Sequence, residues 1–347
     1  MKTVAYGCGY VPPEWIAAHG LVPRRVCPSL ASCRWALGEG QCPYARALGA
    51  AIEQEDAIDA AVFTTLCAQM RQSAEALSQR CAKPVFVLNL PATWRGAGSA
   101  GYYRDELVRL GRFLVRCGGV EPGPEELADR LLAYDHARAQ LREQAPHLGG
   151  GAVLDAIYQL HATGRFDPPA LSARSIHASG PTAGARASQP ACSPAMAGAS
   201  GRVRLAVLGG PVVQEELSLY ELIGQAGATV ALEASSSGER SLAGPMDRRR
   251  LREDPLAELT AAYFGTIPHP FRRPNTGLYD WLSEQLPRRA VRGIVLRRYV
   301  WCDLWHAELA RLRSTLAVPV LDLDVCAQGN TRERTAGRVG AFVEMLR

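Results

Sequence analysis

The chain has 347 residues, of which 47% are hydrophobic and 21% are charged, and its formal net charge is +5. This length exceeds what one core usually supports, so two domains are expected, and the composition excludes a chain that is disordered throughout. The charge is small and spread along the chain, which gives no support for nucleic-acid binding. The sequence contains neither a secretory signal nor an apolar stretch of about 18 residues, which predicts a cytoplasmic protein without a membrane span.

The first half of the chain is predicted to alternate strands and helices. Strands are expected at 60–65 and 84–90, where the sequences AAVFTT and PVFVLNL are rich in β-branched and aromatic residues. A helix is expected at 102–117. Two more helices, at 124–144 and 152–163, repeat leucine and alanine at helical spacing and are expected to form a helical connector.

A change of composition separates the two halves. From 168 to 201 the chain is dominated by Ala, Ser, Gly and Pro, with almost no large apolar residue. This composition is typical of a flexible linker. Cys192 lies within this segment and is therefore excluded as a preorganised ligand.

The second half returns to alternating strands and helices, which predicts a parallel α/β domain. Strands are expected at 204–210, 229–234, 293–300 and 318–324. Helices are expected at 215–225, 256–263 and 278–286, from 304 onward, and at the C-terminus. The predicted division is an N-terminal α/β domain with the connector at 1–165, a linker at 166–202, and a C-terminal α/β domain at 203–347.

The chain has ten cysteines, and in a reducing compartment they indicate metal binding or reactive thiols rather than disulfides. Cys67 and Cys302 each follow a predicted strand, and ligands bind beyond the carboxyl ends of parallel strands. Both precede helical segments, as does Cys42, and amides at a helix N-terminus stabilise negative charge. A free cysteine also serves as a small buried apolar side chain, and for each single cysteine that alternative stays open. The absence of a CxxC pair disfavours zinc ribbons and ferredoxin-type binding.

Short motifs along most of the chain resemble one known family. In the first half they are CGYVPPEWIAAHGLVP, CPYARAL, TTLCAQMR and FVLNLPAT. In the second half they are RVRLAVLGGPV, DPLAELTAAYF, RGIVLRRYVWCDLWHAE and VPVLDLDVCAQGNTRERTAGRVGAFVEML. Their order and character resemble the components of 2-hydroxyacyl-CoA dehydratases and benzoyl-CoA reductases, together with their double-cubane cluster relatives.

This resemblance implies a fold, a cofactor and partners. Two flavodoxin-like domains would meet around a [4Fe-4S] cluster held by Cys42, Cys67 and Cys302. Cys8 and Cys27 look like a cysteine pair of the double-cubane branch, so they would supply further ligands to an [8Fe-9S] cluster, or they are buried thiols beside the site. The family also implies a homodimer or heterodimer and a separate ATP-dependent activator as electron donor, since the chain has no phosphate-binding loop of its own.

Three functions follow from the resemblance. The first is an iron-sulfur component, a lyase or an oxidoreductase, that passes a low-potential electron to a bound acyl-CoA thioester. The second is a double-cubane reductase of small molecules. The third is a non-catalytic paralogue that acts as partner subunit or electron relay, which is favoured by Ala68, where the family motif has Asp, and by the linker, which replaces much of the helical segment that family members have between their domains. The loop LEASSSGER also diverges from the family motif, which argues against acyl-CoA binding.

Glu14 is the one candidate acid or base that the sequence offers near the first motif. It follows two prolines in VPPEW, so it could act as a general acid or base beside the cluster. A glutamate in the first turn of a helix also stabilises the helix dipole, and both interpretations stay open.

Overall fold

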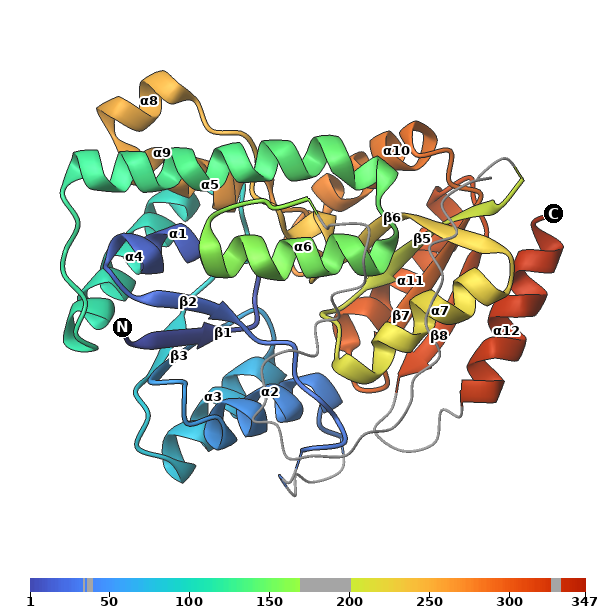
Figure 1. Cartoon of the computed structure of the whole chain (residues 1–347), viewed down its shortest axis with the longest axis horizontal. Helices are drawn as coiled ribbons and strands as arrows, with labels where there is room; N and C mark the ends of the chain where they lie inside the picture. The colour runs from blue at the N-terminus through green and yellow to red at the C-terminus, as the bar shows by residue number, and fades with distance from the viewer. Residues whose placement is uncertain (34, 36–39, 169–200, 326–331) are drawn as a thin grey trace.

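The computed structural model describes residues 1–33, 35, 40–168, 201–325 and 332–347. Two four-stranded sheets, parallel throughout, form the framework of these residues (Figure 1). The first has the order β2 (Val22–Arg25), β1 (Thr3–Tyr6), β3 (Ala60–Thr64), β4 (Val85–Leu88). The second has the order β6 (Ala228–Ser235), β5 (Val203–Gly209), β7 (Gly293–Tyr299), β8 (Val320–Val325). The two sheets therefore share one topology, which confirms two flavodoxin-like α/β domains.

Helices cover both faces of the first sheet. They are α1 (Pro13–Ala18) and α4 (Ser99–Arg116) on one face, and α2 (Pro43–Gln54) and α3 (Ala68–Arg80) on the other. The central strand β3 is buried along its whole length, and its side chains alternate between the two layers. Val62 packs beneath α1 and α4, whereas Phe63 packs beneath α2 and α3. Burial on both faces explains why this strand is a continuous apolar run.

The second sheet is covered in the same way. Its helices are α7 (Ser218–Gln225) and α12 (Arg332–Met345) on one face, and α10 (Thr276–Arg288) and α11 (Asp303–Thr315) on the other. At the end of β5, Gly209 has a φ of +148°, and a Cβ there would lie 1.9 Å from the carbonyl oxygen of Arg297. Only glycine permits this close approach of β5 to β7.

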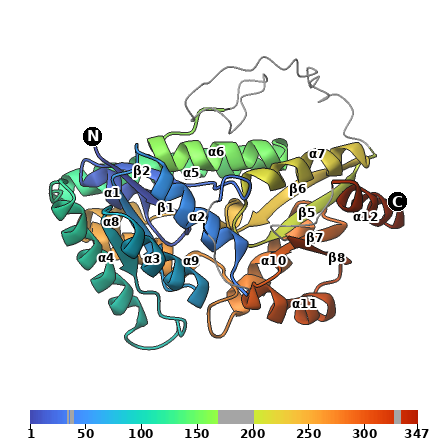
Figure 2. The ribbon, with the colours of Figure 1, turned by 90° about the horizontal axis from the view of Figure 1, so that it is seen from below.

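Four helices join the two halves of the chain. They are α5 (Pro124–Gln144), α6 (Gly150–Thr163), α8 (Arg248–Glu253) and α9 (Pro255–Thr266). Helix α6 packs on β2 and on β6, the edge strands of the two sheets, and Figure 2 shows it spanning both. Helices α8 and α9 return from the second half to pack against α5. Short 3-10 helices lie at Ala145–His147, Gln214–Leu217 and Glu239–Ser241.

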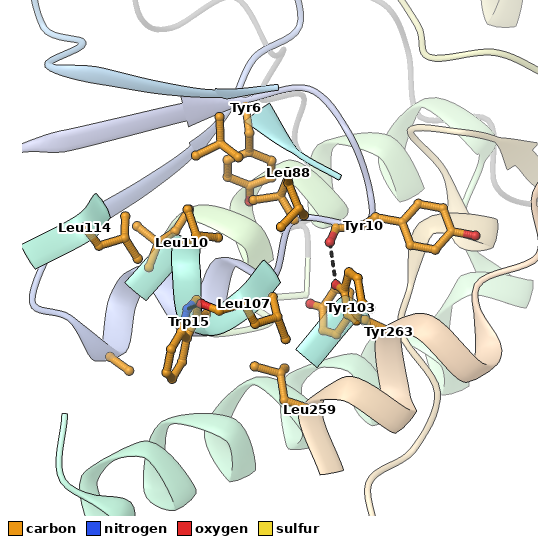
Figure 3. Packing of buried hydrophobic residues seen from close by; sticks show 14 of the residues in the cluster. Tyr6, Tyr10, Trp15, Leu88, Tyr103, Leu107, Leu110, Leu114, Leu259 and Tyr263 are labelled. Carbon is orange, nitrogen blue, oxygen red and sulfur yellow. Dashed lines mark hydrogen bonds between the residues drawn. The ribbon is translucent and has the colours of Figure 1, made fainter. Parts of the chain in front are cut away.

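The core beneath α4 therefore contains residues from both halves (Figure 3). Leu259 and Tyr263 of α9 lie close to Leu107 and Tyr103 of α4, and the Tyr103 hydroxyl donates to the carbonyl oxygen of Tyr10 at 2.7 Å. The packing of α9 ties the second half to the first. The predicted domain boundaries stay a prediction, since most of the predicted linker lies outside the described residues, as does Cys192.

The strands and helices expected from the sequence are present in the described residues, with shifts of a few residues at their ends. The two strands missing from the expectation are β1 and β2, each only four residues long. None of the helices in the described part of the chain is long and apolar enough to cross a membrane.

Candidate functional site

A cavity lies where the carboxyl ends of the two sheets meet. Its volume is about 760 Å³, including space open to solvent. Its walls come from the residues that follow β1, β3, β5, β6 and β7, and from the loop before α10. The strand order changes direction between β1 and β3 in the first sheet and between β5 and β7 in the second. Parallel α/β folds usually bind their ligands in the crevice outside the carboxyl ends of the strands at such a point. The topology alone thus makes this cavity the candidate site.

Three of the predicted cysteines line this cavity, and each occupies the N-cap position of a helix. Cys42 precedes α2, Cys67 precedes α3 and Cys302 precedes α11. Because β3 and β7 have the same place in their sheets, Cys67 and Cys302 occupy equivalent positions in the two domains. The positive end of a helix dipole stabilises a thiolate at each position.

Burial disfavours the charged form of all three thiols. The pKa of Cys42 is raised to about 12, chiefly by burial and in part by Cys302 and Cys67. Burial also raises the pKa values of Cys67 and Cys302, against the lowering effect of backbone amides in the first turns of α3 and α11. The thiols are therefore protonated at neutral pH by themselves, and a bound cation would release their protons.

Gln69 holds the Cys42 loop in place. Its side-chain oxygen accepts the backbone N–H of Cys42 at 2.9 Å, and its amide nitrogen donates to the carbonyl oxygen of Gly40 at 3.1 Å. Gln69 lies two positions after Cys67, so the start of α3 fixes two of the three cysteines. This role of Gln69 could not be predicted from the sequence, because Gln69 and the Cys42 loop lie far apart along the chain.

The other predicted ligands differ in position. Cys8 follows β1 and lines the cavity, and the preceding Gly7 is packed so closely that a Cβ would lie 2.5 Å from the Tyr44 hydroxyl. Cys27 is not among the lining residues, and its thiol donates to the carbonyl oxygen of Val212 at 3.5 Å. The structure thus brings Cys8, but not Cys27, to the cavity with the three N-cap cysteines.

Glu14 lies in a buried ion pair rather than in the cavity wall. Its carboxylate accepts from the Arg138 guanidinium at 2.7 Å and from the Tyr263 hydroxyl at 2.7 Å, and both charged side chains are almost fully buried. The pair joins α1, α5 and α9. This geometry supports a structural role, and the catalytic role stays a prediction.

Comparison with known proteins identifies the family. The family model for the D-component of 2-hydroxyglutaryl-CoA dehydratase matches residues 8–346. The chain belongs to this family. The match includes every strand from β2 to β8 and all three N-cap cysteines, and it confirms the resemblance inferred from the motifs. No curated protein shows significant similarity to the chain.

The two departures from the motifs of 2-hydroxyacyl-CoA dehydratase components have different consequences. Ala68, the first residue of α3, is exposed and is not part of the cavity wall, so Ala in place of Asp leaves the lining unchanged. The divergent loop LEASSSGER, in contrast, contributes Ser236 and Arg240 to the wall. The sequence did not mark Arg240 as a site residue.

The residues of this dehydratase-type component fit an iron-sulfur cluster better than a single ion. In the described part of the chain, no group of three His, Cys, Asp or Glu side chains could hold one metal ion. A cubane cluster places each thiolate on a different iron, so it requires ligands that are farther apart. Tyr44 also lines the cavity, and its buried hydroxyl has no hydrogen-bond partner among the described residues, as expected where an occupant supplies an acceptor.

Proposed function

We propose that this chain is the iron-sulfur component of a 2-hydroxyacyl-CoA dehydratase-like or benzoyl-CoA reductase-like system. Cys42, Cys67 and Cys302 would hold a [4Fe-4S] cluster that passes a low-potential electron to a bound acyl-CoA thioester. The observation that carries this proposal is the convergence of three N-cap cysteines, from both domains, on one cavity. When bound through three thiolates, such a cluster supplies one electron and an iron with an open coordination position.

The residues of the chain would prepare the cavity for that chemistry. Apolar side chains line it, among them Leu66, Met70 and Ile267, and they exclude water from the reacting groups. His269 lies in the same wall, and burial, together with nearby arginines, lowers its pKa well below the usual value. Its Nδ1 accepts the N–H of Phe271 at 3.2 Å, so the neutral ring carries its proton on Nε2 and can donate a hydrogen bond there.

The proposal also includes partners. The sequence has no phosphate-binding loop, so ATP-driven delivery of electrons would come from a separate activator protein. The family name describes a component, which supports a further subunit or a second copy of this chain. The location that we propose is the cytoplasm, where thiol ligands remain reduced.

The test is anaerobic purification followed by iron quantification and electron paramagnetic resonance. Wild type is expected to contain about four irons per chain, and Cys67→Ser is expected to lose or alter the signal. Cys117→Ser is the matched control, because Cys117 is buried at the C-terminal end of α4 and is not part of the cavity wall. A colourless wild-type protein, or an unchanged spectrum in Cys67→Ser, would contradict the proposal.

One observation favours a second candidate, a double-cubane reductase of small molecules. Cys8 lines the same cavity as the three N-cap cysteines, so a fourth thiol is at hand for a larger [8Fe-9S] cluster. To bind such a cluster, the Cys27 thiol would have to break its hydrogen bond to the carbonyl oxygen of Val212. About eight irons per chain, falling to about four in Cys8→Ser, would establish this candidate, and about four irons in wild type would remove it.

A further inference from the structure

The wall of the cavity contains one permanently charged side chain. Among the described residues that line it, only Arg240 carries a fixed charge, and none is an aspartate, a glutamate or a lysine. Arg240 is 1% exposed. A buried cation that lacks a counter-ion is costly, so the protein keeps a positive charge at this cavity against a strong penalty.

The hydrogen bonds of Arg240 do not supply that counter-ion. Nε donates to the carbonyl oxygen of Ala234 at 3.0 Å, and Nη1 donates to that of Pro268 at 2.8 Å. Nη2 donates to the carbonyl oxygen of Gly209 at 2.9 Å and to the hydroxyl of Ser236 at 2.6 Å. All four acceptors are neutral, and a guanidinium has five N–H donors. The side chain is therefore held firmly, but none of its hydrogen bonds is to a carboxylate. Glu233 acts on its charge without a hydrogen bond to it, and burial raises the pKa of that carboxyl to about 7.

Several other buried arginines of this chain are paired with carboxylates, whereas buried Arg25 and Arg272 donate to neutral acceptors and are not part of the cavity wall. Arg297 forms an ion pair with Glu216, and Arg138 forms one with Glu14. Arg240 instead lies over the indole ring of Trp305, with its guanidinium carbon 5.2 Å from the ring centroid. Burial lowers the pKa of Arg240 to about 10, so it still carries its charge at neutral pH. The missing partner of Arg240 is thus expected inside the cavity that both residues line.

We propose that Arg240 is a positioning residue that balances the negative charge of the thiolate-bound cluster and thereby sets its reduction potential. This inference rests on the proposed function. Three thiolates and an oxidised cubane core sum to a single negative charge, which one guanidinium neutralises. A one-electron donor of low potential then adds a second negative charge, and a nearby buried cation stabilises this reduced form more than the oxidised one.

The test is a redox titration of the anaerobic holoprotein with titanium(III) citrate, monitored by electron paramagnetic resonance. At the potential where wild type is half reduced, Arg240→Gln is expected to lower the ratio of reduced to oxidised cluster at least tenfold, which corresponds to 59 mV for one electron. Arg240→Lys keeps the charge, so its ratio is expected to stay within about threefold of wild type, on the same scale. A purely structural role would shift neither ratio.

Arg142→Gln is the matched control. Arg142 donates to the carbonyl oxygen of Ala243, burial likewise lowers its pKa to about 10, and it is not part of the cavity wall. Its loss is expected to leave the potential unchanged. If Arg240→Gln does not fold, Arg240→Met, which also removes the charge, takes its place: a tenfold shift supports the role of the charge, and a retained potential contradicts it.

The iron content tests the proposed function, whereas the reduction potential tests the role of Arg240. Wild type without iron would overturn the function itself. Iron-loaded Arg240→Gln with an unchanged potential would overturn only the role of Arg240.

Discussion

The buried pair of Glu14 and Arg138 permits a quantitative prediction. Arg138 keeps its Nε and Nη2 without hydrogen-bond partners among the described residues, so Glu14 is its closest counter-charge, and the Asp135 carboxylate lies 3.9 Å from Nη2. Burial by itself would lower the pKa of Arg138, but Glu14 raises it above the usual value. Glu14→Gln leaves this buried guanidinium with only the more distant Asp135, which is expected to lower the free energy of unfolding by about 3 kcal/mol.

The assay is equilibrium unfolding in urea, followed by circular dichroism. A second variant, Glu14→Leu with Arg138→Met, removes both charges and is expected to be more stable than Glu14→Gln, because no unpaired charge remains. Glu253→Gln is the control, since Glu253 makes the same kind of pair with Arg249 on the surface. That exposed pair is expected to contribute less than about 0.5 kcal/mol.

Two results would refute this reasoning. One is a cost for Glu14→Gln no greater than that for Glu253→Gln. The other is a double variant as unstable as the single one. Loss of turnover in Glu14→Gln at unchanged stability would instead favour the catalytic role predicted from the sequence.

Two further predictions concern the Cys42 loop and pH. Gln69→Ala removes two hydrogen bonds that hold the Cys42 loop, worth about 1 kcal/mol each. The rate of iron loss to a chelator is therefore expected to rise about tenfold or more. Gln79→Ala, on the exposed side of the same helix, is the control and is expected to leave that rate unchanged. Burial raises the pKa of Glu233 to about 7, against the lowering effect of the bond from Tyr220, so the folded state binds this proton more tightly than the unfolded state. The free energy of unfolding is therefore expected to fall as pH rises from about 4.5 to 7, relative to Glu233→Gln, and equal pH profiles in urea unfolding would contradict this.

The sequence predicted most of the fold because its central elements carry a clear pattern. Strands β3, β5 and β7 are long apolar runs followed by helices of regular periodicity, which indicates parallel α/β architecture. Strands β1 and β2 escaped prediction because β1 is only four residues long and β2 consists of one valine, Pro23 and two arginines, so neither carries a clear apolar pattern. They form only by pairing in parallel with one another and with β3.

The candidate site was predicted in part. The positions of Cys67 and Cys302 after strands placed them at one edge of each sheet, and the motifs added Cys42. The roles of Gln69 and Arg240 could not be predicted, because each depends on partners brought together from distant segments. Glu14 is the opposite case. Its sequence motif suggested a general acid or base, whereas in the fold its carboxylate forms a buried ion pair with Arg138.

The sequence by itself determined the α/β class, the family and the cysteines that follow strands, because local periodicity and short motifs depend only on residues close together along the chain. Tertiary structure decided which thiols share a cavity and which buried charges are paired. Those properties depend on how two sheets and a returning pair of helices, α8 and α9, pack against one another. The cysteines define the candidate centre, and the packing around them places Arg240 as the one fixed charge among the described residues of its wall.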